Sequence, residues 1–199
     1  MSIAAPHEIF PLADKAKDFI EKFEKSVPVI LTKRLRLRAP KLTDFEYYSE
    51  IALSPSGRFI LETQNREAAW LDFANMIACW FLRGHGLWAI ETRENNSIVG
   101  FVLIGFEPGD LEPELGYMLR SKDIGKGYAT EAAIAAKQFA FDVLRFSTLV
   151  STIDHDNAAS IKIAQKLGGI RDMAAENAHG NLILVFRYAA DGGELLPMD

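Results

Sequence analysis

The sequence is poor in cysteine, with one residue, Cys79, in a chain of 199. A single cysteine excludes a disulfide within the chain. Cys79 lies in the apolar stretch Met76–Phe81, and small side chains in such surroundings are usually buried. We therefore predict a buried side chain at Cys79, and not a nucleophile or a covalent acyl carrier.

Long apolar runs and an excess of positive charge are also missing. The longest run, Ile98–Phe106, is too short to cross a bilayer, and the first residues do not resemble a secretory signal. The formal net charge is −5, and no basic tract is interleaved with aromatic residues. We expect a protein of the cytoplasm that binds neither a membrane nor nucleic acid.

Several catalytic motifs are absent. His7, His85 and His179 lack metal-ligand spacing with cysteine or carboxylates, so no metal is expected. No Gly-x-Ser-x-Gly hydrolase motif occurs. Gly127 stands where a P-loop needs serine or threonine, and Thr130 where a dinucleotide fingerprint needs its third glycine.

A glycine-rich turn that runs directly into a helix is the main feature that is present. Residues 125–131 read Gly-Lys-Gly-Tyr-Ala-Thr-Glu, and apolar residues then recur at helical spacing as far as Leu144. Glycine lets backbone N–H groups approach phosphate oxygens, and a helix start adds unpaired donors and a positive dipole end. Lys126 adds a cation. The pattern predicts a pyrophosphate-binding loop for a nucleotide-like cofactor, with an ordinary turn before an amphipathic helix as the alternative.

The rest of the chain alternates between strand and helix patterns, and its 49% of hydrophobic residues suffices for one core. Pro11–Lys25 is predicted to be an amphipathic helix that ends before Pro28 and packs on the domain or on another subunit, which leaves a homodimer open. Strands are expected near 31–38, 87–91, 98–106, 112–119, 148–153, 170–173 and 182–188, and helices near 43–51, 67–83, 129–144 and 157–167.

Two local patterns predict further detail. Arg34, Arg36 and Arg38 alternate along an expected strand and are predicted to form a solvated face. Thr43 and Glu46 have the spacing of a capping box, so a helix should begin there.

The glycine loop resembles the acetyl-CoA loop of the GNAT superfamily of acetyltransferases. The family pattern Gln/Arg-x-x-Gly-x-Gly/Ala falls on 124–129, with Ile124 at its first position. Gly-Lys-Gly-Tyr-Ala-Thr-Glu-Ala is nearly the block found in the branch of the ribosomal-protein N-terminal (alanine/serine) acetyltransferases. Segments 31–38, 156–160 and 166–169 resemble other motifs of that branch.

The resemblance extends from about Val29 to Tyr188 and implies an α+β fold, with a GNAT-like, mostly antiparallel central sheet flanked by helices. It suggests three parts: an N-terminal amphipathic helical extension over 1–28, the N-acetyltransferase domain over 29–190, and a C-terminal tail over 191–199. It also implies an enzyme that moves an acetyl group from acetyl-CoA to a primary amine by direct attack in a ternary complex.

The resemblance further implies a set of cofactor contacts. The pyrophosphate is expected on the loop, the pantetheine arm on exposed backbone of the strand before it, and a further contact on the later Asn-x-x-Ser motif. These residues are, in that order, Gly125, Lys126, Gly127, Tyr128, Ala129 and Thr130; Tyr117, Met118 and Leu119; and Asn157. Asn157 serves equally well as a helix N-cap.

Two residues are candidates for catalysis. Glu114 is the preferred base, since a carboxylate there could take the amine proton directly or through water, with Glu112 as the alternative two residues away on the same strand face. Ser160 is expected to donate a hydrogen bond to the departing thiolate. A non-catalytic acyl-CoA-binding or regulatory protein is the competing interpretation, because Ser121 and Ile124 depart from the family pattern.

The acceptor amine stays open: a protein N-terminus, a lysine, an amino acid, a polyamine or a small drug. Specificity is expected to lie in Ser49–His85. Its aromatic residues either wall an apolar pocket or belong to the core; they are Trp70, Phe73, Trp80 and Phe81.

Overall fold

The structure is a computed structural model that describes residues 5–9, 13–61, 63–107, 109–180 and 182–190. Its strands are β1 (Ile30–Leu31), β2 (Leu35–Arg38), β3 (Leu87–Thr92), β4 (Ile98–Gly105), β5 (Glu114–Leu119), β6 (Val150–Ile153), β7 (Ile170–Arg171) and β8 (Leu184–Arg187). They form one sheet in the order β1-β2-β3-β4-β5-β6-β8-β7. Only β5 and β6 pair in parallel. The predicted mixed, mostly antiparallel sheet is confirmed.

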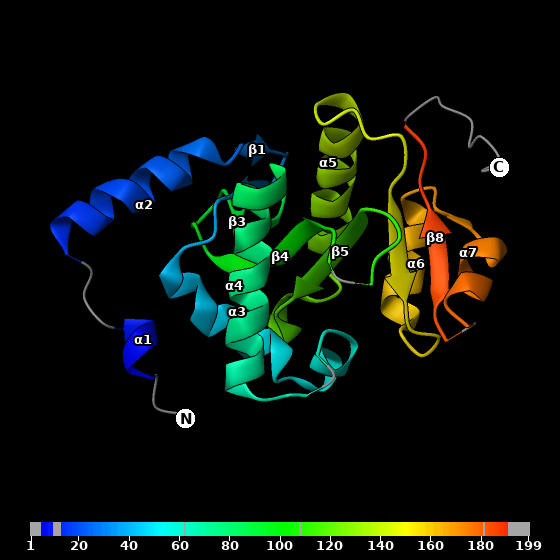
Figure 1. Ribbon diagram of the computed structural model, residues 1–199, viewed down its shortest axis with the longest axis horizontal. Helices are drawn as coiled ribbons and strands as arrows, with labels where there is room; N and C mark the ends of the chain where they lie inside the picture. The colour runs from blue at the N-terminus through cyan, green and yellow to red at the C-terminus, as the bar shows by residue number, and fades with distance from the viewer. Residues whose placement is uncertain (1–4, 10–12, 62, 108, 181, 191–199) are drawn as a thin grey trace.

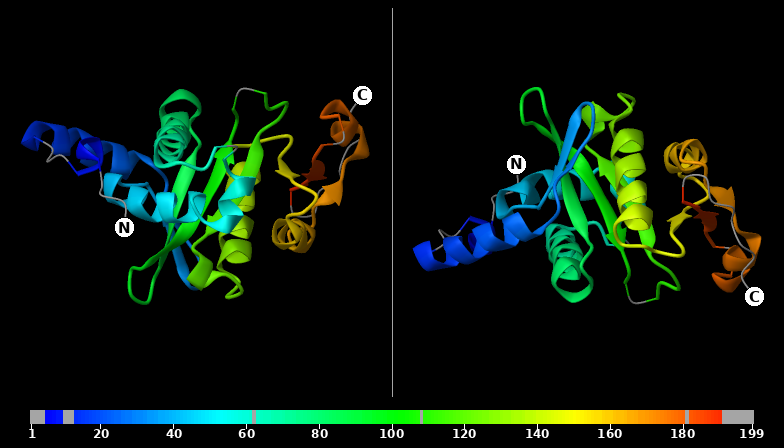
Figure 2. Two further views of the ribbon diagram at one scale, coloured as in Figure 1. Left: turned by 90° about the horizontal axis from the view of Figure 1, so that it is seen from below. Right: turned by 90° about the horizontal axis from the view of Figure 1, so that it is seen from above.

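The helices lie on both faces of this sheet. They are α1 (Pro6–Ile9), α2 (Asp14–Ser26), α3 (Phe45–Ala52), α4 (Arg66–Arg83), α5 (Tyr128–Asp142), α6 (Ala158–Lys166) and α7 (Met173–Ala178), with 3-10 turns η1 (Leu42–Asp44), η2 (Pro55–Phe59) and η3 (Ser121–Asp123). Figure 2 shows the sheet between α4 on one side and α5 on the other. For each of the longer helices after Pro28, the predicted first residue lies within two residues of the observed one. The short α7 was not predicted.

Small side chains let α5 pack closely on the sheet. Ala132, Ala133, Ala136 and Ala140 are fully buried against β4 and β5. Because alanine brings the helix backbone near the strands, the first turn of α5 lies close to the end of β5. On the other face of the sheet Phe73 of α4 is buried. Trp80 of α4 instead packs against the cluster on the α5 side, its ring 4.6 Å from that of Trp88, and its indole donates to the carbonyl of Leu87 at 2.8 Å.

The expected strand over 31–38 is wrong as one element. The chain turns at Thr32–Arg34, and β1 pairs antiparallel with β2, Ile30 opposite Leu37. A contact from α5 fixes the turn, since the Glu131 carboxylate accepts from the hydroxyl of Thr32 at 2.6 Å and from the N–H of Arg34 at 2.8 Å. No local pattern could signal a partner about a hundred residues away.

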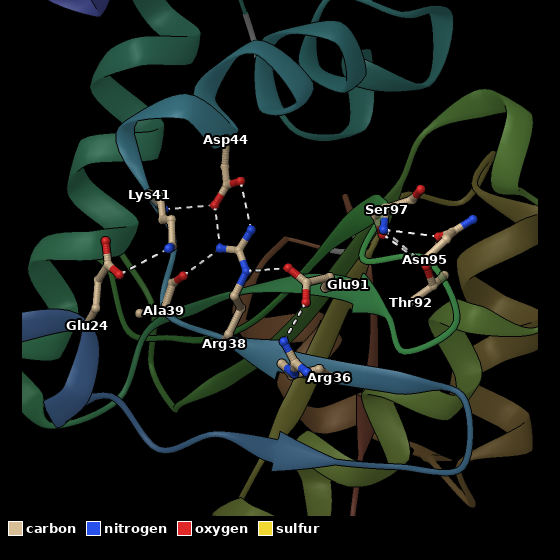
Figure 3. Close-up of polar contacts among 10 residues, drawn as sticks. All are labelled: Glu24, Arg36, Arg38, Ala39, Lys41, Asp44, Glu91, Thr92, Asn95 and Ser97. Carbon is tan, nitrogen blue, oxygen red and sulfur yellow. Dashed lines mark hydrogen bonds and ion pairs between the residues drawn. The ribbon is translucent and has the colours of Figure 1, made fainter. Parts of the chain in front are cut away.

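The predicted solvated face is wrong for Arg38, whose side chain is 15% exposed, whereas those of Arg34 and Arg36 are 44% and 43% exposed. Figure 3 shows the side chains of Arg36 and Arg38 turned to the Glu91 carboxylate of β3, at 2.9 Å for Arg36 and 2.8 Å for Arg38. Arg38 further donates to both oxygens of Asp44, at 2.7 and 3.0 Å. Asp44 is 2% exposed, so these charges are buried because they are paired.

Asp44 also corrects the predicted capping box. The carboxylate that accepts a backbone N–H at this chain turn belongs to Asp44, which bonds the N–H of Lys41 at 2.8 Å. Thr43 and Glu46 form no reciprocal pair, and η1 precedes the helix. A carboxylate suits this position better than a hydroxyl, because it can accept from the guanidinium of Arg38 and from the N–H of Lys41 at the same time.

Helix α2 is held to the rest of the protein at its C-terminal end. It ends at Ser26, before Pro28 as predicted; the predicted start at Pro11 lies outside the described residues. Phe23 stacks on Phe81 of α4 with ring centroids 4.6 Å apart, whereas Phe19 is 64% exposed. Figure 1 shows the helix running away from the sheet toward its N-terminal end.

Candidate active site

The site forms where β5 and β6 separate. The two parallel strands share a single paired position, Glu114 opposite Val150, with the N–H of Val150 donating to the carbonyl of Pro113 at 3.0 Å. One residue further on, the hydroxyl of Ser151 donates to the carbonyl of Leu115 at 2.6 Å. The hydroxyl of Ser151 thus takes the place of a backbone hydrogen bond between the two strands. Beyond this position the edge of β5 does not pair with β6.

The ladder with β4 decides which backbone groups of β5 face this opening. The N–H of Arg120 donates to the carbonyl of Val99 at 2.9 Å, which turns the N–H and C=O of Leu119 away from β4. Since directions alternate along a strand, Tyr117 also points to the opening, whereas the backbone groups of Met118 bond β4. Two of the three predicted backbone positions are therefore available to a ligand.

Glu114 sits at the point of separation. Its Oε1 accepts from the N–H and the hydroxyl of Thr152 on β6, at 3.0 and 2.6 Å. Burial raises the pKa of Glu114 to about 7, and the nearby carboxylates of Asp110 and Glu107 act in the same direction. A carboxyl that titrates near neutral pH can both accept and release a proton there.

Glu112, the alternative base, is tied into an ion pair. Arg187 of β8 donates to both of its carboxylate oxygens, and the Thr148 hydroxyl bonds it as well. Arg187 also donates to Asp172 at 2.8 Å. Hydrogen bonds from Arg187 hold the pKa of Glu112 below its ordinary value. The arrangement favours an anchor between β5 and β8 over a base.

The glycine loop adopts a backbone that glycine alone favours. Gly125 and Gly127 have φ of 83° and 80°, in the left-handed region. Helix α5 begins immediately afterwards, with Gly127 as its N-cap and no side-chain cap. The N–H groups of Tyr128, Ala129 and Thr130 therefore have no acceptor within the helix. This is the donor set that was predicted for a phosphate.

Lys126 does not stand as an unpaired cation. Its ammonium pairs with Oδ1 of Asp123 at 2.7 Å, and both residues line a cavity of about 220 Å³ beside the β3–β4 turn. Asp123 is 5% exposed, and its Oδ2 is the one buried side-chain oxygen without a partner in the described part of the chain. The charge of Lys126 is thus largely offset within the loop.

Asn157 and Ser160 lie at the start of α6, across the opening from β5. Oδ1 of Asn157 accepts from the N–H of Ser160 at 3.2 Å, so the N-cap interpretation is confirmed. The carbonyl of Ser160 accepts from the hydroxyl of Tyr117 at 3.0 Å. The phenol side chain of Tyr117 therefore spans the opening, a role that its position in the sequence did not suggest.

The residues that sequence reasoning missed act through partners far away in the chain. Thr152 reaches Glu114 across 38 positions, and Arg34 reaches Glu131 across 97. A single sequence carries no signal for such pairs; their residue types alone are compatible with a solvated surface.

Two further findings concern the described residues alone. No group of three or more histidine, cysteine, aspartate or glutamate side chains in them could hold a metal ion. No described helix is both long and apolar enough to cross a membrane.

Comparisons with known proteins identify relatives. A family model described as acetyltransferase (GNAT) domain matches residues 34–170. The crystal structure of an acetyltransferase from Agrobacterium tumefaciens is 33% identical, with a TM-score of 0.77, over 82% of this chain and 95% of that one. The uncharacterized protein YkkB of Bacillus subtilis is 35% identical over 92 residues, which are 43% of this chain; the match spans about half (52%) of YkkB.

Some of the structural neighbours were solved with a ligand. RimL, a ribosomal L7/L12 alpha-N-protein acetyltransferase in complex with coenzyme A, has a TM-score of 0.64 at 14% identity, over 83% of this chain and 100% of that one. At that identity the likeness is one of fold.

Proposed function

Because the chain belongs to the GNAT acetyltransferase family, we propose that it moves an acetyl group from acetyl-CoA to a primary amine by direct attack in a ternary complex. Residues 34–170 form an acetyl-CoA-dependent N-acyltransferase domain of the GNAT type, as the resemblance implied. The observation that carries the finer proposal is the separation of β5 from β6, with Glu114 at its start and the glycine loop just after β5.

The loop and the open strand edge supply two kinds of contact. The N–H groups of Tyr128, Ala129 and Thr130 suit phosphate oxygens, since they are unpaired donors at the positive end of α5. The backbone groups of Tyr117 and Leu119 suit the amides of the pantetheine arm. Bound acetyl-CoA supplies the activated thioester; the protein supplies its alignment.

Glu114 is proposed as the base. An amine attacks only in its neutral form, so a proton acceptor with a pKa near 7 is well matched to neutral conditions. Thr152 holds the carboxylate through Oε1, and no hydrogen bond within the described residues engages Oε2. One carboxylate oxygen is therefore fixed and the other is free to accept the proton.

Ser160 is proposed to stabilise the departing thiolate with its hydroxyl, while Asn157 fixes the turn that presents it. Cys79 is not a covalent carrier in this scheme, because its side chain is buried and burial raises the pKa of its thiol.

The test is consumption of acetyl-CoA across a panel of amines and peptide N-termini, followed by release of the CoA thiol. Turnover that depends on one class of amine supports the proposal. Tight binding of CoA without thiol release for any amine supports the alternative, a non-catalytic acyl-CoA-binding or regulatory protein.

For the best amine of the panel, Ser160→Ala is expected to lower kcat at least about fivefold, the equivalent of one hydrogen bond worth ~1 kcal/mol. KM for acetyl-CoA should change less, since the bond forms only as the thiolate leaves. A kcat within twofold of wild type would remove Ser160 from the mechanism.

A further inference from the structure

Arg34, the last residue before β2, contacts the glycine loop at two residues, Lys126 and Tyr128. Its Nη1 donates to the carbonyl of Lys126 at 2.9 Å. Its guanidinium lies over the ring of Tyr128, 4.7 Å from the centroid. A Cβ built on Gly127 would meet its Nη2 at 3.4 Å, within ordinary van der Waals distance. One planar group thus contacts the residues on both sides of Gly127.

Arg34 is itself held in place from α5. Its Nε donates to Oε2 of Glu131 at 2.6 Å and its backbone N–H to Oε1 at 2.8 Å, while the hydroxyl of Thr32 donates to the same Oε1 at 2.6 Å. Although burial works against it, these hydrogen bonds hold the pKa of Glu131 below its ordinary value. The carboxylate is therefore ionised near neutral pH and fixes both the position and the plane of the guanidinium.

We propose that Arg34 is a positioning residue for the acetyl-CoA loop. It clamps the backbone carbonyl of Lys126 and the ring of Tyr128 to the β1–β2 turn and to Glu131, so that the loop has its binding conformation before the cofactor arrives. The inference deepens the proposed function and rests on it. A loop with two left-handed residues and no side-chain cap is costly to order. If Arg34 already orders the loop in the folded protein, the entropy lost on ordering it is not subtracted from the free energy of cofactor binding.

Arg34 is not a catalytic residue in this proposal. Its contacts reach the loop, the β1–β2 turn and α5, and none of them reaches Glu114 or Ser160. Loss of the clamp should therefore weaken cofactor binding and leave the chemical step intact.

The chain offers a matched control in Arg36, two residues along. Its side chain is 43% exposed and pairs with Glu91 at 2.9 Å, against 44% and 2.6 Å for Arg34 and Glu131. Arg36 makes no hydrogen bond to the glycine loop in the described structure. Both substitutions remove one half-exposed ion pair, but only one removes a loop contact.

The experiment compares Arg34→Ala with Arg36→Ala. Calorimetric titration with CoA should show a dissociation constant raised about tenfold for Arg34→Ala, the equivalent of one charge-assisted hydrogen bond, and unchanged for Arg36→Ala. KM for acetyl-CoA should rise in parallel while kcat stays within twofold. Arg34→Lys keeps the charge without the planar fork and should fall between wild type and Arg34→Ala.

Four outcomes are decisive. An unchanged dissociation constant for Arg34→Ala overturns the proposal, and so does an equal loss in Arg36→Ala, which would indicate general weakening. If thermal unfolding shows that Arg34→Ala does not fold, Arg34→Lys decides alone: binding as tight as wild type overturns the clamp. Wild-type protein that binds no CoA would instead refute the proposed function.

Discussion

Replacing Thr152 by valine should move the pH dependence of the reaction. Valine keeps the shape of threonine but removes the hydroxyl that donates to Oε1 of Glu114 at 2.6 Å, while the backbone N–H of residue 152 stays in place. In the wild type this hydrogen bond stabilises the ionised carboxylate. Its removal should therefore raise the pKa of Glu114 further above its ordinary value.

The size of the shift follows from the bond that is removed. A hydrogen bond to a charged group contributes about 1.5–3 kcal/mol, part of which the protonated carboxyl also enjoys. A net difference of ~1.4 kcal/mol is about one pKa unit. From the present value of about 7, the ionised fraction at pH 7 would fall from about one half to about one tenth, which corresponds to a rate about fivefold lower.

The assay is kcat/KM for the best amine between about pH 6 and 9.5, with thiol release as the readout. The deficit of Thr152→Val should shrink as pH rises and vanish above about pH 9, where both carboxylates are ionised. Glu114→Gln should be slow throughout, recovering only as free amine accumulates. The amine titrates identically with all three proteins, so any displacement of the acid limb belongs to the enzyme.

Two results would refute this reasoning. A profile of Thr152→Val that is lower by the same factor at every pH would mean that the hydroxyl does not act through ionisation of Glu114. A profile of Glu114→Gln with the height and shape of wild type would exclude Glu114 as the base. Carbon-13 signals of labelled glutamate, assigned by their loss in Glu114→Gln, check the shift without any acceptor.

Two further predictions concern stability. Arg187→Leu leaves Glu112 buried without its partner and should lower the free energy of unfolding by about 3 kcal/mol in urea denaturation. Because the pKa of Glu112 in the folded protein is lowered, this loss of stability should be complete above the ordinary glutamate pKa of about 4.3. It should disappear as the pH falls through the lowered pKa of Glu112. A loss below about 1 kcal/mol at pH 7 would contradict it. Asn157→Ala and Asn65→Ala each remove a helix N-cap, at 3.2 and 2.8 Å, and should each cost about 1 kcal/mol. Only Asn157→Ala should also raise KM for acetyl-CoA. An equal KM in both variants would mean that Asn157 caps α6 and has no role in cofactor binding.

The features that were predicted correctly have local causes. Gly125 and Gly127 specify a left-handed turn by themselves, and the alanines of α5 signal a close helix-sheet contact through their spacing. The two strands of the β3–β4 hairpin were likewise predicted from two short apolar runs separated by a polar turn. For the same reason, the glycine turn before α5 could be predicted from the sequence, whereas the α+β architecture followed from the family resemblance; the role of the loop as a cofactor site stays a prediction.

The features that were missed depend on partners distant in the chain. The β1–β2 turn exists because Glu131 accepts from both sides of it, and the arginines of β2 are paired because Glu91 and Asp44 face them. That Met118 bonds β4 follows from register, which alternation alone does not fix. The division of the chain at residue 28 stays a prediction.

The separation of β5 from β6 also bears on how the protein unfolds. Across that line the described sheet is joined by one backbone pairing, by the side-chain bonds of Glu114, Ser151 and Tyr117, and by the ion pair of Glu112 with Arg187. We therefore expect local opening to begin along this line, which one buried apolar cluster crosses from Leu115 to Phe186. On the proposed mode of binding, acetyl-CoA contacts both the edge of β5 and the start of α6, so it should hold the two sides of this line together and raise the free energy of unfolding.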